Sequence, residues 1–312
     1  MRPVEPGARI VVVRNPRSGS ALDTATLQKA LQSAGVSADV ADIPNGSEFD
    51  AWIGQLAGRY AVIAAAGGDG TVSSVAAAVA RAGKTLAVIP TGTMNHFARD
   101  VGIPTGLSAA MAVLRTGRPG AVDVGIVNDR FFLNNVSLGS YPRMVDERTD
   151  LERRGRSPRI AAIVAIARTW WRLRSVTAVL TVDGRDLIRR SPFIVVGNGR
   201  YVLSGFALSR RHQISDHQLS LYVAPRAGRL GALSLPIRAL LGTLDRYEQF
   251  ETFHASEITM NLTQRQVLTG IDGEVRELES PLRFAVRPGA LQVLLPQPGA
   301  PTTRNLRRGV EP

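Results

Sequence analysis

In the stretch Tyr60-Ala-Val-Ile-Ala-Ala-Ala-Gly-Gly-Asp-Gly-Thr71, an apolar run of strand length ends in three glycines, an aspartate and a threonine. Behind it, apolar residues recur from Val72 to Val79 at the i, i+3, i+4 and i+7 spacing of one helix face. Glycines let a backbone approach a ligand, and a helix N-terminus offers N–H groups to phosphate. Asp69 would repel a bound phosphate unless a divalent cation lay between them. We therefore interpret residues 67–71 as a metal-nucleotide site.

Two further turns have the same character. An apolar run at 10–13 leads into the turn 15–20, and another at 86–89 leads into the turn 90–95. Strands that alternate with helical segments predict a parallel sheet with helices on both faces. Ligands of such sheets bind at the carboxyl ends of the strands. We therefore expect the three turns to lie at one edge of one sheet.

Helical spacing and glycine stops predict the other elements of this half. Leu27, Ala30, Leu31 and Ala34 share one helix face, and Gly35 is well placed to end that helix. Further elements are expected at 36–43 (strand), 49–58 (helix), 72–82 (helix) and 107–117 (helix).

After Gly120 the pattern changes to short strands separated by turns, which predicts a mainly antiparallel second half. The expected strands are 122–127, 131–136, 176–182, 186–188, 193–196, 219–224, 258–262, 267–269, 282–286 and 291–295. Helices are expected at 158–174 and 229–248, a charged surface loop at 150–159, and a disordered tail at 298–312.

Composition narrows the class of protein. The chain has 312 residues, which suits two domains, and its net charge of +12 favours negatively charged partners. Aromatic residues make up only 5% and do not interleave with arginine, which argues against nucleic acid. Cysteine is absent, so thiolate catalysis and disulfides are excluded. Because no signal peptide or apolar run of about 20 residues occurs, we expect a cytoplasmic protein with at most peripheral membrane contact.

The residues of the turns suggest how phosphate would be bound. No G-x-x-x-x-G-K-[ST] motif occurs, so a Walker-type loop is excluded. The backbone amides of 67–71 and the side chains of Asn15, Thr71 and Thr93 are the expected phosphate contacts. Plainer alternatives stay open at this point: 67–71 as a tight turn, Asn15 as a turn cap, Asp123 as an ordinary strand carboxylate, and Asp272-Gly273 as a hairpin turn.

Five motifs occur in a fixed order: Asn15-Pro-Arg-Ser-Gly19, Gly67-Gly-Asp-Gly-Thr71, Pro90-Thr-Gly-Thr-Met-Asn95 with Phe97-Ala-Arg99, Val122-Asp-Val-Gly125 and Gly270-Ile-Asp-Gly-Glu274. Together they resemble the diacylglycerol kinase catalytic family, in its bacterial lipid-kinase branch, which is related to sphingosine kinases. The resemblance implies an α/β ATP-binding domain at 9–122 plus 288–297, completed by the last strand. It also implies a β-rich, antiparallel sandwich-like lipid-substrate domain at 123–287, with the active site in the interdomain cleft.

The resemblance also implies roles for single residues. Asp69 and Asp123 would hold Mg²⁺ through water, and Asp272 would be the general base on the lipid hydroxyl, with Glu274 extending to the same side. Asp216 corresponds to a ligand of a second, structural magnesium. The residues expected to bind ATP are Asn15, Gly67, Gly68, Asp69, Gly70, Thr71, Thr93 and Asn95.

The chain departs from the family pattern at two places. His96 stands where family members often have aspartate, so it either weakens the metal network or is a structural histidine. In the stretch 214–219, relatives commonly have Asp-Asp-Gly; Asp216 is kept, whereas Ser215 and His217 differ. The basic, apolar segment 159–174 would either rest on an anionic bilayer or pack as a helix between domains.

These observations predict an ATP- and Mg²⁺-dependent kinase for diacylglycerol or a similar lipid, met at the membrane surface. Kinases of a sphingoid base, of another lipid alcohol or of NAD are alternatives, as is a weakly active regulator that binds nucleotide or lipid. No nucleic-acid partner is expected, and a homodimer is left open.

Overall fold

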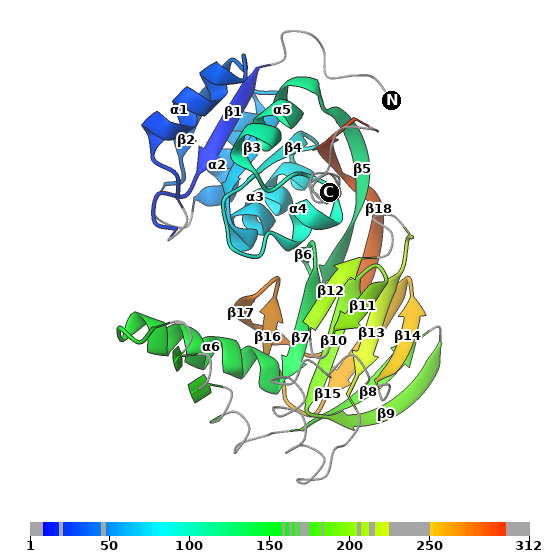
Figure 1. Ribbon diagram of the computed structural model, residues 1–312. Coiled ribbons are helices and arrows are strands. Elements are labelled where there is room, and N and C mark those ends of the chain that lie inside the picture. The colour runs from blue at the N-terminus through cyan, green and yellow to red at the C-terminus, as the bar shows by residue number, and fades with distance from the viewer. Residues whose placement is uncertain are drawn as a thin grey trace, which may run out of the picture. The chain divides into compact units, whose positions relative to one another are not determined.

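The computed structural model describes residues 9–18, 21–44, 48–157, 160–161, 164–165, 168, 175–182, 184–204, 207–211, 216–224 and 250–297. The chain forms two compact units, Met1–Asp123 with Pro288–Pro312 and Val124–Arg287 (Figure 1). The helix expected at 229–248, the tail at 298–312 and most of the helix expected at 158–174 lie outside the described residues.

The first unit contains the expected parallel sheet. Its strands follow the order β2 (Ala38–Asp42), β1 (Ile10–Arg14), β3 (Val62–Gly67), β4 (Thr85–Pro90) and β18 (Leu282–Leu295). Each neighbouring pair is parallel, including β4 with the end of β18. The last strand therefore returns to the first unit, as the resemblance implied. Every residue of β3 is buried, which explains its unbroken apolar sequence.

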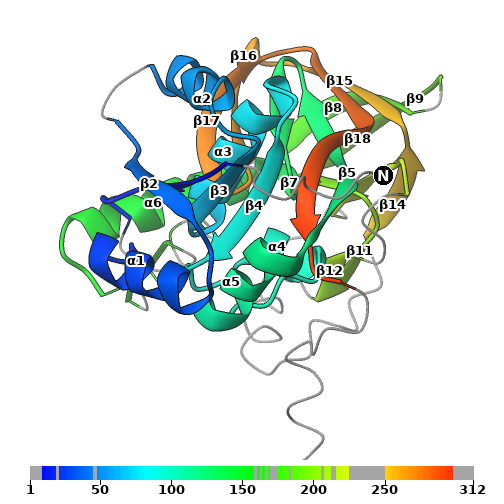
Figure 2. The same cartoon turned by 90° about the horizontal axis from the view of Figure 1, so that it is seen from above.

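Helices cover both faces of this sheet (Figure 2). They are α1 (Thr24–Ser33), α2 (Phe49–Ala57), α3 (Asp69–Arg81), α4 (His96–Asp100) and α5 (Leu107–Thr116). Leu27 and Leu31 of α1 pack with Met111 of α5 against one face, in a cluster that includes Val12 and Ala64. On the other face α2 packs against α3. Gly35 has a φ of +66° directly after α1 and ends it, as predicted.

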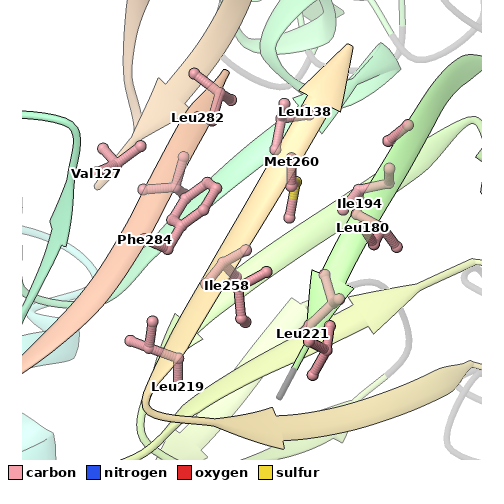
Figure 3. Close-up of a cluster of buried hydrophobic side chains, with 14 of the residues drawn as sticks. Val127, Leu138, Leu180, Ile194, Leu219, Leu221, Ile258, Met260, Leu282 and Phe284 are labelled. Atoms are coloured by element: carbon pink, nitrogen blue, oxygen red, sulfur yellow. The ribbon is translucent and has the colours of Figure 1, made fainter. Parts of the chain in front are cut away.

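The second unit is an antiparallel sandwich, as expected. A six-stranded sheet has the order β14-β13-β10-β7-β16-β17, and every described pair in it is antiparallel. Leu138 and Ile194 from this sheet meet Ile258 and Phe284 from facing strands in one buried cluster (Figure 3). The elements are β5 (Arg118–Val127), β6 (Arg130–Phe132), β7 (Asn135–Gly139), α6 (Ser140–Arg153), β8 (Val176–Val182), β9 (Arg185–Ser191), β10 (Phe193–Asn198), β11 (Tyr201–Ser204), β12 (Ala207–Arg211), β13 (Leu219–Val223), β14 (Glu251–Ala255), β15 (Glu257–Leu262), β16 (Gln266–Ile271) and β17 (Glu274–Glu279).

Three local predictions were wrong. The strand expected at 131–136 is broken, because the amides of 133–135 turn away from the ladder to bind a carboxylate. The strands expected at 282–286 and 291–295 are one strand, β18, which continues through Gly289 at a φ of +60°. The loop expected at 150–159 begins inside α6. That helix has a polar sequence and Pro142 in its first turn, where the missing N–H costs no hydrogen bond.

Candidate active site

The first glycine turn delivers the backbone of α3 to the carboxyl edge of the sheet. Gly67 ends β3, Gly68 is the N-cap in an extended conformation, and α3 begins at Asp69. A Cβ on Gly67 would lie 2.5 Å from Cβ of Thr71, so only glycine fits at this position. No side chain caps the N-terminus of α3. The N–H groups of its first turn therefore form an uncapped donor site at the positive end of the helix dipole.

The third turn packs directly on the first glycine turn, backbone against backbone. A Cβ on Gly92 would lie 2.6 Å from Cα of Gly68 and 2.9 Å from Oδ1 of Asn95. The Thr91 amide donates to the carbonyl of Gly67 at 3.0 Å. Asn95, at a φ of +50°, donates from Nδ2 to the carbonyl of Gly92 at 2.6 Å. The turns at 67–71 and 90–95 are therefore neighbours, as expected. Their close packing requires glycine at position 92, which lies in the third motif but was not among the expected site residues.

Asp69 joins the same two turns through its side chain. Its Oδ1 accepts a hydrogen bond from the backbone N–H of His96 at 2.7 Å. His96 is the first residue of α4 and is half-buried. The donor is the backbone N–H of residue 96. The hydrogen bond is therefore available whether the side chain there is histidine or the aspartate that family members often have.

The turn after β1 belongs to the same sheet edge. Arg14 pairs with Ala66 in the parallel ladder, so Asn15 follows β1 beside the end of β3. Oδ1 of Asn15 accepts from the amide of Arg17 at 3.1 Å, which is the turn-capping role. Thr93 is exposed.

One hydroxyl at this edge has no partner. Oγ1 of Thr91 is buried and lacks a hydrogen-bond partner among the described residues. A buried polar atom without a partner costs roughly 1–3 kcal/mol, so it indicates an unfilled interaction. Thr91 was not among the expected site residues, although it directly follows β4 in the third turn.

Donors at this edge fit a polyphosphate, since the helix N-terminus and the Thr91 hydroxyl can face its oxygens. In the described part of the chain, no three or more His, Cys, Asp or Glu side chains are grouped so that they could hold a metal ion. Mg²⁺ usually keeps several waters and takes only one or two carboxylates together with substrate phosphates. Asp69 fits such a site. Asp123 is 2% exposed and accepts from the Gly289 amide at 2.9 Å; its metal role stays a prediction.

Asp272 in the second unit is held by an unusual set of contacts. It follows β16 at a φ of +48°, and Gly273 at +88° completes the turn into β17. Its Oδ1 accepts from the amides of Asn134 and Asn135 at 2.7 and 3.1 Å. Its Oδ2 accepts from the Leu133 amide at 2.8 Å. Asp272 is thus both part of a hairpin turn and a carboxylate held by three backbone amides.

Buried asparagines support the loop that binds Asp272. Asn198 donates from Nδ2 to the Leu133 carbonyl at 3.0 Å and from its amide to the Asn134 carbonyl at 2.9 Å. Asn134 is 6% exposed, and its Oδ1 has no partner among the described residues. The sequence signal for this loop was the pair Asn134-Asn135 inside an expected strand, where asparagine is disfavoured.

Glu274 and Asp216 are engaged with neighbouring residues. Glu274 is exposed and pairs with Arg276 at 2.9 Å. Asp216 accepts from the amides of Arg200 and Gln218 at 3.2 and 3.3 Å, and Nε of Arg200 lies 3.8 Å from its Oδ2. These donors use both carboxylate oxygens, and no further acid joins them among the described residues. Residues 212–215 lie outside the described residues, and the role of Asp216 as a ligand of a structural magnesium stays a prediction.

A hydrogen-bonded pair lies near Asp216. Ser220 Oγ and Nδ1 of His254 are 2.8 Å apart. Burial, followed by the positive charge of Arg200, lowers the pKa of His254, whereas Asp216 opposes that shift. Burial also raises the pKa of Tyr222, whose hydroxyl donates to the Tyr201 carbonyl. This region therefore favours a neutral imidazole.

The first unit is an α/β domain with a parallel sheet, in which a glycine turn leads into the uncapped N-terminus of α3, and an antiparallel sandwich follows it. Residues 9–127 match the family described as the diacylglycerol kinase catalytic domain. Residues 135–295 match the YegS C-terminal NAD kinase beta sandwich-like domain. The chain belongs to the diacylglycerol kinase catalytic family, in its bacterial, YegS-like branch, and is therefore a kinase.

Individual relatives agree with this assignment. A Pseudomonas aeruginosa protein described as a probable lipid kinase, YegS-like, is 34% identical over 272 residues, covering 80% of this chain and 81% of its own. A protein of the same description from Pseudomonas syringae pv. tomato is 31% identical over 257 residues, covering 77% and 78%.

Solved structures share the fold. A crystal structure of a diacylglycerol kinase from Bacillus anthracis str. Sterne has a TM-score of 0.66 at 18% identity, covering 93% of this chain and 97% of its own. A second structure from that strain has a TM-score of 0.72 at 20% identity. Within the described residues, no helix is both long and apolar enough to cross a membrane.

Proposed function

We propose that this protein is an ATP-dependent lipid kinase that transfers the γ-phosphate to the hydroxyl of diacylglycerol or a similar lipid. One observation carries the nucleotide half of the proposal: the Asp69 carboxylate bonds the His96 amide and thereby joins two turns at the uncapped end of α3. The names of the YegS-like relatives support a lipid acceptor.

Phosphoryl transfer depends mainly on positioning and on charge neutralisation. The amides at the start of α3 and the Thr91 hydroxyl would bind the phosphate oxygens of ATP. Gly92 keeps the third turn close enough to complete this cradle. Mg²⁺, when bound, would supply the positive charge that neutralises the phosphates, with Asp69 and Asp123 as its proposed protein ligands.

Asp272 is the proposed general base for the acceptor hydroxyl. Three amides fix both of its oxygens, so the carboxylate is oriented before the substrate arrives. Because the transition state of phosphoryl transfer is loose, the main contribution expected of such a base is positioning of the acceptor hydroxyl.

The direct experiment incubates the purified protein with labelled ATP, Mg²⁺ and one acceptor at a time: diacylglycerol, phosphatidylglycerol, sphingosine and NAD. Label in a phosphorylated lipid supports the proposal. NAD is included because the second half matches a domain described as NAD kinase-like. If only NADP carries the label, NAD and not a lipid is the acceptor. ATP binding without any labelled product would favour the alternative of a weakly active regulator that binds nucleotide or lipid.

The lipid substrate places the reaction at a membrane surface, so we propose peripheral, transient membrane contact for a cytoplasmic protein. Co-sedimentation with vesicles that contain diacylglycerol tests this contact. Retention of the protein in the supernatant at every lipid concentration would contradict it.

A further inference from the structure

A pocket of about 410 Å³ lies within the second unit, at the end of the sandwich where α6 begins. Its lining residues come from the start of α6, the start of β8, the end of β9 and the turn between β15 and β16. The first residues of β16 border the pocket, whereas Asp272 follows the last. Leu268, the last residue of β16 in the lining, is four residues of strand before Asp272, which is about 13 Å, so the pocket is separate from the proposed base.

Two arginines from different elements line this pocket. Arg143 comes from α6 and Arg190 from β9, and among the described residues no Asp or Glu lines the pocket. Neither arginine forms an ion pair within the described part of the chain. Two like charges that border one cavity repel each other, and an anion bound between them would remove that repulsion. The planar guanidinium favours phosphate because it can donate two parallel hydrogen bonds.

The remaining lining residues supply neutral donors and a small apolar wall. Ser175, Thr177 and Thr263 contribute hydroxyls, and Gln264 contributes an amide. Val176, Leu262, Val267 and Leu268 complete the lining. Hydroxyls and amides suit phosphate oxygens, while the apolar wall suits the carbon chain of an ester.

The start of α6 adds to the positive potential of the pocket. Gly139 is the N-cap of this 14-residue helix, and no side chain caps it. Gly139 has a φ of +89°, and a Cβ there would collide with the Pro192 carbonyl oxygen. Glycine is therefore required for the chain to turn from β7 into α6 at the pocket. The positive end of the helix dipole then borders the same cavity as both arginines.

We propose that this pocket is a second anion site, which binds the phosphate group of a phosphate ester, carried either by a small soluble molecule or by a lipid head group. Arg143 and Arg190 hold the phosphate from two sides, and the apolar wall contacts the adjoining carbons. The proposal does not rest on the lipid kinase reaction, so its failure would leave that reaction untouched.

The test compares two double variants with equal loss of charge. Arg143→Gln/Arg190→Gln removes both guanidiniums from the pocket. Arg156→Gln/Arg185→Gln is the matched control, because its arginines are exposed, as Arg143 and Arg190 are, and belong to the same unit but lie outside the pocket. Calorimetry with sn-glycerol 3-phosphate measures the soluble source, in the presence of Mg²⁺ and a non-hydrolysable ATP analogue that fills the nucleotide site. Flotation with phosphatidylcholine vesicles, with and without phosphatidic acid, measures the lipid source.

We expect the wild type and the control to bind at least one probe saturably, and the pocket variant to bind it at least tenfold more weakly. If the pocket variant loses binding only of sn-glycerol 3-phosphate, the ligand is a soluble phosphate ester. If it loses binding only of vesicles with phosphatidic acid, the ligand is a lipid head group. Equal binding by the two double variants, or no saturable binding of either probe by the wild type, overturns the proposal. If the pocket variant fails to fold, the single variant Arg190→Gln is compared with Arg185→Gln on the same strand.

Discussion

The carboxylate of Asp69 and the backbone N–H of His96 are 2.7 Å apart, and this bond ties the start of α3 to the start of α4. The two residues follow different strands, β3 and β4, which are parallel neighbours. This side chain, together with the Thr91–Gly67 backbone bond and the packing of Gly92 on Gly68, fixes the spacing of two turns at the sheet edge. The proposed nucleotide site depends on that spacing.

Asp69→Asn separates the two roles of this side chain. Asparagine can still accept from the His96 amide through its carbonyl oxygen but lacks the charge proposed for the metal ion. We expect kcat to fall by about 10²–10³-fold while thermal stability changes little. Steady-state kinetics at varied Mg²⁺ and a melting curve provide the measurement. An unchanged kcat would mean that Asp69 serves only through its hydrogen bond to the His96 amide and not as a metal ligand.

Gly92→Ala tests the close approach of the two turns. The added Cβ would lie 2.6 Å from Cα of Gly68, and backbone cannot move aside cheaply. We expect a loss of about 1–3 kcal/mol in the free energy of unfolding and a higher KM for ATP. Gly54→Ala is the control, because no atom lies within 4 Å of its Cβ position in α2. That change should stabilise the protein by up to about 1 kcal/mol; similar behaviour of the two variants would refute the packing account.

Asp272→Asn tests the anchored carboxylate. One oxygen becomes an NH₂ group that faces an amide donor, so we expect a loss of about 1–3 kcal/mol in unfolding free energy. Losing the base should lower kcat by about 10²–10⁴-fold with little change in the Kd of ATP. Glu274→Gln removes only an exposed ion pair and should change stability by at most about 0.5 kcal/mol. Full turnover by Asp272→Asn would eliminate it as the base.

The lowered pKa of His254 predicts that the stability of the folded protein depends on pH. Because burial lowers its pKa in the folded state, the unfolded chain binds more protons near its ordinary value of about 6.5. The contribution of neutral His254 to the free energy of unfolding is complete above that pH. It is lost as the pH falls through the lowered pKa of the folded state. His254→Asn should therefore flatten the fall of Tm below about pH 6.5. His217→Asn is the control, since asparagine tolerates the φ of +55° there, and it should keep the wild-type slope.

Local patterns were sufficient to predict much of the first unit. The glycines at 67, 68 and 70 lie where an apolar strand meets a helical repeat, and both signals are contained in the twenty residues 60–79. The same holds for α1, whose end at Gly35 follows from its need for a positive φ. Elements with strong short-range periodicity were therefore predictable.

Long-range contacts were not predictable in this way. The amide of Asn134 bonds Asp272 across 138 positions of the chain, and this pairing breaks the strand expected at 131–136. The packing of Gly92 on Gly68 is likewise a property of two neighbouring strands and not of either turn. α6 was missed because its polar sequence carries no apolar stripe.

Hydrogen–deuterium exchange with and without ATP and Mg²⁺ tests the central claim most directly, because it reports on the amides proposed to hold the nucleotide. The account predicts slower exchange in peptides that contain residues 67–71 and 91–96, with both protections reduced in Gly92→Ala. Saturating ATP that leaves both segments unprotected, or that protects only other parts of the chain, would contradict a nucleotide site at this edge of the sheet.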